Sequence, residues 1–190
     1  MLTHFIKSIN WIDLALVILF IRMIYTGVTT GFISEIFKFI GVVVAVFVSL
    51  HYYSFLAAWV ALKTNFPWHY WELVIFAVLW LFVLLCFKYL REGITLLFKA
   101  ETTHEGFDKY AGGIVAVGRG ILVCSLTLFL VLLAQNNYLS RLTLRSYSFK
   151  IAGRAAVGTY TFLYNHLVDK LFVGEHYNAN AQRVLHSTNK

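Results

Sequence analysis

The chain has 190 residues, of which 59% are hydrophobic and only 13% are charged, and its formal net charge is +7. A soluble domain carries about 25% charged residues, so this composition excludes an ordinary soluble globular protein and indicates an integral membrane protein. The basic residues flank apolar runs and form no basic cluster, which is typical of topology signals and of contact with anionic headgroups. We therefore expect the lipid bilayer, and no nucleic acid, as a partner.

Four apolar runs predict four transmembrane helices, at residues 11–25, 34–59, 70–90 and 111–134. About 20 mostly apolar residues cross the hydrocarbon core, and helices satisfy their own backbone groups there. The runs do not alternate between apolar and polar residues as barrel strands do. The sequence therefore predicts an all-α, polytopic membrane protein with about four transmembrane helices plus a C-terminal amphipathic helix.

The amphipathic helix is predicted over residues 141–173, after the fourth run. Its apolar side chains recur at i+3 and i+4 spacing, so that it lies in the membrane interface or packs on a partner. This stripe consists of Phe149, Ala152, Ala156, Tyr160, Leu163, Leu167 and Leu171. Residues 174–190 are polar and predict a disordered tail. The chain thus divides into a transmembrane domain at 1–140, the amphipathic helix at 141–173 and the tail at 174–190.

Charged residues inside the apolar runs are the informative ones, because a charge at a helix centre costs about 3 kcal/mol or more. Asp13 is either favoured by the dipole of its own helix or a functional carboxylate. Arg119 lies about 12 Å of helix beyond Ala111, too deep to reach water easily. We expect it to pair with Glu35 or Asp13, because Asp108 lies about 16 Å away along the axis. The pair either fixes helix packing or belongs to an ion or substrate path.

Small residues at four-residue spacing mark two candidate contact faces. Gly112, Ala116 and Gly120 form a smooth stripe on which another backbone can come close, and Gly27 and Gly31 precede the second run. Together with the charged residues they make up the candidate helix-packing or functional motif: Asp13, Gly27, Gly31, Glu35, Asp108, Gly112, Ala116, Arg119 and Gly120.

The sequence carries no recognisable catalytic or metal-binding motif. There is no G-x-S-x-G, no H-E-x-x-H and no P-loop, and no two of the seven histidines are three or four residues apart. We therefore expect no catalytic residue, no metal and no cofactor, and predict that the chain is not an enzyme. An intramembrane enzyme is the least favoured of the function classes.

Four segments in order, WIDLALVILF, GVTTGFISEI, SLHYYSFLA and FDKYAGGIVAVGRGILV, resemble the colicin V production (CvpA) family over residues 10–135. The last segment is the most specific and reads D-x-x-x-G-x-x-x-small-x-x-R-G. Two positions depart from the family pattern, Thr30, where a basic residue is frequent, and Ala116, where a glycine is expected. The resemblance places these residues on motif positions: Asp13, Gly27, Gly31, Glu35, Asp108, Gly112, Arg119 and Gly120.

The resemblance implies a multi-pass protein of the bacterial inner membrane, linked to colicin V production and envelope physiology. The first hypothesis is a non-enzymatic protein that supports bacteriocin (toxin) production or export and envelope homeostasis through membrane-protein partners or as a homo-oligomer. The alternative is an oligomeric small channel or transporter with a path lined by the Arg119 site, because four spans are too few for a wide internal pore. The loops after the first and third spans carry slightly more basic residues than the segments on the other side of the membrane. Because the more basic side is usually cytoplasmic, this predicts that both termini face the periplasm.

Overall fold

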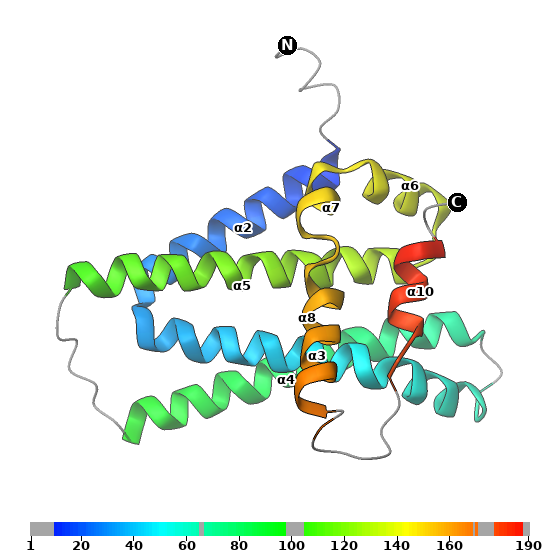
Figure 1. The fold of residues 1–190 in the computed structure, drawn as a ribbon, viewed down its shortest axis with the longest axis horizontal. Helices are drawn as coiled ribbons and strands as arrows, with labels where there is room; N and C mark the ends of the chain where they lie inside the picture. Colours follow the sequence, from blue (N-terminus) through cyan, green and yellow to red (C-terminus); the bar gives the residue numbers. More distant parts are fainter. Residues whose placement is uncertain (1–9, 65–66, 98–104, 169, 171–176, 188–190) are drawn as a thin grey trace, which may run out of the picture.

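A computed structural model describes residues 10–64, 67–97, 105–168, 170 and 177–187 (Figure 1). Within these ranges the chain is helical and contains no strand. Four of the helices carry stretches long and apolar enough to cross a membrane, which confirms the predicted all-α polytopic fold. The elements in chain order are α2 (Trp11–Thr30), α3 (Phe32–Ala61), α4 (Trp68–Leu97), α5 (Glu105–Leu133), α6 (Asn137–Arg145), α7 (Tyr147–Ala152), α8 (Ala155–Leu163), the π-helical turn η1 (Tyr164–Val168) and α10 (Asn180–Ser187).

The spans extend beyond the apolar runs that predicted them. α2 continues to Thr30 rather than residue 25, and α5 begins at Glu105 rather than residue 111. Only Gly31 separates α2 from α3, and its φ of +81° is a conformation that glycine adopts readily and other residues avoid. Because a helix continues past its apolar run until a residue can turn the chain, hydropathy alone predicts these helices too short.

Helix α5 is the centre of the bundle. It lies between α2 and α3, and α4 packs on the far side of α3 (Figure 1). In the most apolar part of each span, 56% of the α5 residues are buried, against 22% for α2 and 11% for α4. The two helices that follow each other most closely in sequence, α2 and α3, share few contacts because α5 lies against both of them. The packing of the bundle therefore depends on long-range contacts to α5.

An aromatic cluster fills the interior between α3, α4 and α5. The rings of Tyr53, Phe76 and Phe129 contact one another with centroid distances of 5.2 to 5.9 Å. Tyr160 of α8 joins this region, and its hydroxyl lies 3.1 Å from Nδ1 of His51. All of these rings are buried, so α8 is part of the same core as the transmembrane helices.

The segment after α5 differs from the single amphipathic helix predicted over 141–173. It breaks at Ser146, whose side chain accepts a hydrogen bond from the N–H of Phe149 and so starts a new helix, and again at Gly153. The predicted apolar stripe does face inward, because Ala152, Ala156 and Tyr160 are buried. The side chains of Leu167 and Leu171 lie outside the described residues. The pattern thus predicted which face is apolar, but this face packs on α3 and α5 of the same chain rather than on the membrane interface or a partner. The breaks, which the pattern did not predict, come from local capping.

The predicted disordered tail also differs from the structure in its described part. Residues Asn180–Ser187 form α10, which contacts α5 and buries Ala181. Just before it, Asn178 donates from its side chain to the carbonyl of Leu50 at 2.7 Å and from its backbone to the Tyr160 hydroxyl at 3.0 Å. The polar residues of this segment bind groups of the protein itself, so polar composition did not indicate disorder here. Residues 174–176 and 188–190 lie outside the described part.

Candidate functional site

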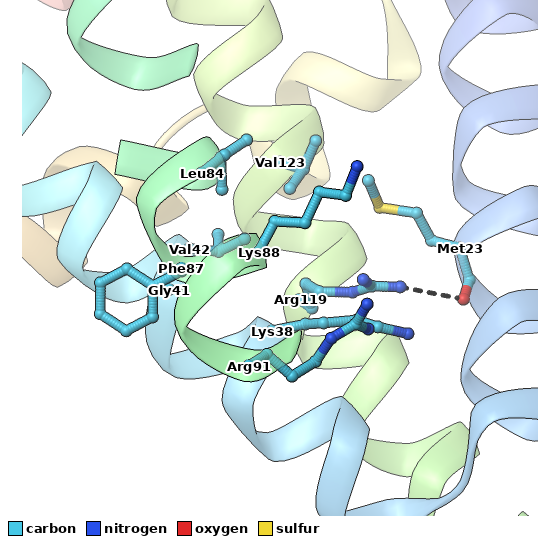
Figure 2. Close-up of a pocket in the computed structure, with 10 residues that line it drawn as sticks. All are labelled: Met23, Lys38, Gly41, Val42, Leu84, Phe87, Lys88, Arg91, Arg119 and Val123. Atoms are coloured by element: carbon cyan, nitrogen blue, oxygen red, sulfur yellow. Dashed lines mark hydrogen bonds between the residues drawn. The ribbon is translucent and has the colours of Figure 1, made fainter. Parts of the chain in front are cut away.

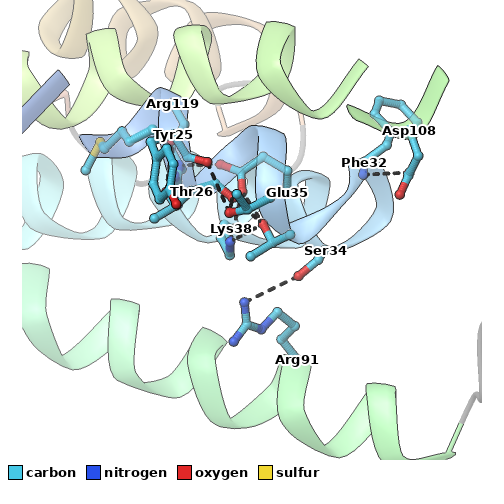
Figure 3. Close-up of polar contacts among 12 residues, drawn as sticks. Tyr25, Thr26, Phe32, Ser34, Glu35, Lys38, Arg91, Asp108 and Arg119 are labelled. Atoms are coloured by element: carbon cyan, nitrogen blue, oxygen red, sulfur yellow. Dashed lines mark hydrogen bonds and ion pairs between the residues drawn. The ribbon is translucent and has the colours of Figure 1, made fainter. Parts of the chain in front are cut away.

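A buried ion pair lies where α2, α3 and α5 meet (Figure 3). Nε of Arg119 lies 2.7 Å from Oε1 of Glu35, whose side chain is fully buried. The Nη2 group of Arg119 donates to the carbonyl of Met23 at 3.3 Å and to the hydroxyl of Thr26 at 3.2 Å. One guanidinium group therefore links three transmembrane helices. The sequence left either Glu35 or Asp13 as the partner of Arg119, and in the structure the partner is Glu35.

The second oxygen of the Glu35 carboxylate is bound as well. Nζ of Lys38 lies 2.9 Å from Oε2, and the hydroxyl of Thr30 lies 3.3 Å from the same atom. Lys38 also donates to the Thr30 hydroxyl at 2.8 Å. Thr30, one of the two departures from the family pattern, is the last residue of α2 and lies within this polar cluster. Two cations share one carboxylate, which leaves one positive charge in excess.

Asp108 has a different role, at the end of the bundle where α3 begins. Its Oδ1 accepts a hydrogen bond of 2.7 Å from the backbone N–H of Phe32, in the first turn of α3 (Figure 3). A negative charge at this place is favoured by the helix dipole. A Cβ atom on Gly31 would collide with the Asp108 carboxylate. Position 31 therefore needs glycine for two reasons, its backbone conformation and the space that Asp108 occupies.

Asp13 caps a helix too, but on α7 rather than on its own helix. It is 5% exposed and accepts hydrogen bonds from the N–H groups of Tyr147 at 3.4 Å and Ser148 at 3.0 Å. Met23, the nearer of the two α2 residues that bind Arg119, lies ten residues further along, which is about 15 Å of helix. The structure therefore does not bring Asp13 to the ion pair. Asp13 does lie in the first turn of its own helix, as the dipole interpretation expects, and the cap on α7 is an additional contact that the sequence did not predict.

Helix α2 lies directly on the small-residue stripe of α5. A Cβ atom on Gly27 would collide with Cβ of Ala116, and one on Gly112 would lie 2.6 Å from the carbonyl oxygen of Gly27. A Cβ atom on Gly120 would lie 2.7 Å from the ring of Phe20. This close approach of the two backbones brings the groups of α2 within reach of the Arg119 guanidinium. The glycines and the arginine of the motif thus serve the same contact.

A cavity of about 290 Å³ opens beside the ion pair (Figure 2). All four spans line it, and its basic residues are Lys38, Lys88, Arg91 and Arg119. Sequence analysis did not single out Lys88 and Arg91, although their spacing of three residues places them on one face of α4. Among the described residues, no group of three or more His, Cys, Asp or Glu side chains is placed to hold a metal ion.

Comparison with known families supports the sequence resemblance. The family model described as colicin V production protein matches residues 12–157, which is most of the chain. The chain belongs to the colicin V production family. It is a multi-pass membrane protein of that family, and the match extends past the four spans through α7 to the first residues of α8. No curated protein and no solved structure gives a match.

The capping role of Asp108 predicts a moderate loss of stability when its carboxylate is removed. We expect Asp108→Ala to lower the free energy of unfolding by about 1–2 kcal/mol, because the first turn of α3 loses its acceptor. Chemical unfolding of the purified protein in detergent micelles, followed by circular dichroism, measures the change. Glu92→Ala removes an exposed carboxylate of α4 and is the matched control, expected to change stability by less than about 0.5 kcal/mol. Equal effects of the two substitutions would contradict the capping role.

Proposed function

We propose that the chain is a non-enzymatic protein of the bacterial inner membrane that supports bacteriocin production or export, and envelope homeostasis, through membrane-protein partners. Membership of the colicin V production family supports the link to toxin production. The Arg119 site supports a packing role, because the contacts described for its guanidinium group go to α2 and α3 of the same chain.

The exposed apolar surface of α4 is the main support for a role through membrane-protein partners. Helix α4 packs mainly on α3, and only 11% of its most apolar stretch is buried. Its large apolar side chains Val78, Leu81, Phe82 and Leu85 are each at least half exposed. An apolar face of a transmembrane helix is covered either by lipid or by another helix. We assign this face to a membrane-protein partner or to a second copy of the chain.

Site-specific photocrosslinking in native membranes tests this assignment. A photoreactive amino acid at Leu81 is expected to give discrete adducts of defined mass with one partner or with the chain itself. The same amino acid at Val83, which is 8% exposed and lies on the same helix, is the control and is expected to give none. Bacteriocin release from the same cells, measured as growth inhibition of a sensitive strain, shows whether the labelled protein is active.

Two outcomes would contradict the proposal. One is the absence of protein adducts from Leu81 in cells where the labelled protein is active. The other is unchanged bacteriocin release when the chain is deleted.

The alternative function is an oligomeric channel or transporter with a path lined by the Arg119 site. The basic lining of the cavity favours an anion over a cation as the transported species. Reconstitution in liposomes separates this alternative from the partner role. Anion flux from wild type that is lost in a folded Arg119→Ala variant would support the path. No flux from folded, assembled protein would exclude it.

A further inference from the structure

The cavity beside the ion pair carries more positive than negative charge. Glu35 is already bound by Lys38 and Arg119, and the cavity adds Lys88 and Arg91. The described residues that line it include no carboxylate. Arg91 lies close enough to Lys38 and Arg119 for the like charges to repel one another. In Figure 2 the charged ends of all four basic side chains lie on the side of α4 that faces Met23, with that of Lys88 apart from the other three. An anion placed among them would relieve this repulsion.

The depth of these residues matches the headgroup region of a bilayer. Lys88 and Arg91 lie at the end of the apolar run of α4, which the sequence predicted over residues 70–90, and lipid headgroups are expected at the end of such a run. Arg119 lies eight residues after Ala111, where the apolar run of α5 begins, which is about 12 Å along the helix. The cavity therefore runs from the level of lipid phosphates towards the middle of the membrane.

The walls of the cavity are apolar. Helix α2 packs on α5 and α4 packs on α3, so the cavity lies between two helices that have little contact with each other. Met23, Leu84, Phe87 and Val123 line it beside the charges. Its volume of about 290 Å³ is near the lower end for small-molecule sites, which suits a headgroup rather than a whole lipid. A molecule bound here would have its charge among the basic residues and its apolar part between α2 and α4.

We propose that this cavity binds the phosphate headgroup of an anionic membrane lipid, with the acyl chains lying along the gap between α2 and α4. Lys88 and Arg91 bind the phosphate at the mouth of the cavity, where Arg91 also donates to the hydroxyl of Ser34 at 3.4 Å. A free phosphate ion shares the chemistry of the headgroup but gains nothing from the apolar walls. The proposal does not depend on the partner role of α4.

A lipid titration of the full-length chain tests the site. The protein is purified in a neutral detergent and titrated with phosphatidylglycerol, phosphatidylcholine and inorganic phosphate, and binding is measured as the rise in melting temperature and by native mass spectrometry. Wild type is expected to bind phosphatidylglycerol more tightly than either other probe. The double variant Lys88→Gln/Arg91→Gln is expected to bind phosphatidylglycerol roughly 30-fold more weakly, and Lys88→Gln alone roughly 5-fold, because each basic residue near a membrane surface contributes a similar factor.

A matched charge control makes the result specific. Lys63→Gln/Arg141→Gln removes the same two charges from exposed positions outside the cavity and is expected to leave the affinity within about twofold of wild type. Equal loss in both double variants would overturn the site, because the binding would then reflect net charge. Unchanged binding by the Lys88→Gln variant and by the cavity double variant would also overturn it. Complete competition by inorganic phosphate at equal concentration would overturn the lipid as the ligand.

Discussion

Replacement of Arg119 by alanine is expected to lower the free energy of unfolding by about 3–5 kcal/mol. The change leaves the fully buried Glu35 carboxylate with Lys38 as its only described cationic contact, and breaking one side of a buried ion pair carries a penalty of this size. It also removes the donor to Met23 and Thr26, so α5 loses these two hydrogen bonds to α2. Chemical unfolding in detergent micelles measures the loss.

A double variant separates a structural role of the Glu35–Arg119 ion pair from a functional one. Glu35→Leu/Arg119→Leu removes both charges at once and is expected to be more stable than Arg119→Ala, because no buried charge is left without a partner. Arg22→Ala removes an exposed arginine of α2 and is the control, expected to cost less than about 1 kcal/mol. A stable double variant without bacteriocin release would show a functional role for the charges. Wild-type stability of Arg119→Ala would contradict the structural role.

Substitution of Gly27 by alanine is expected to destabilise the protein by about 3 kcal/mol, at the upper end for one added methyl group. The new Cβ would occupy the place of the Ala116 Cβ atom and would lie 3.0 Å from the carbonyl oxygen of Gly112. Relief requires α2 to move away from α5, which lengthens the hydrogen bonds of Arg119 to α2. The melting temperature in micelles and the amount of protein in the membrane fraction measure the effect.

The geometry of this contact supplies both a rescue and a control. The exchange Gly27→Ala/Ala116→Gly moves the methyl group from one helix to the other and is expected to recover most of the lost stability. Gly93→Ala adds a methyl group where no atom lies within 4 Å and is expected to be neutral or slightly stabilising. If Gly27→Ala and Gly93→Ala had equal effects, the backbones of α2 and α5 would not be in close contact.

The transmembrane fold was predictable because the signals for it are local. Runs of apolar residues predicted the four spans, and a four-residue period predicted a close helix contact at Gly112, Ala116 and Gly120. The cost of a charge in lipid predicted that Arg119 has an acidic partner. Each of these inferences needs only the residue types within one or two helices.

The parts that sequence analysis missed depend on contacts between distant segments. Asp13 and Asp108 cap helices that begin 134 and 76 residues away from them in the chain, and no local pattern contains that information. The cavity has the same origin, because Lys88 and Arg91 of α4 meet Lys38 and Arg119 only after the bundle forms. The sequence therefore placed both carboxylates in the candidate motif but could not predict that they cap other helices.

The i,i+3 contact between Glu35 and Lys38 has a consequence for biosynthesis. Arg119 follows Glu35 by 84 residues, so at 5–20 residues per second the ribosome makes it about 4–17 seconds later. During this interval α3 enters the membrane with Glu35 and without its partner from α5. Lys38 comes only three residues after Glu35 and is synthesised with it, so we expect the side chain that later lines the cavity to neutralise the carboxylate of the nascent helix first.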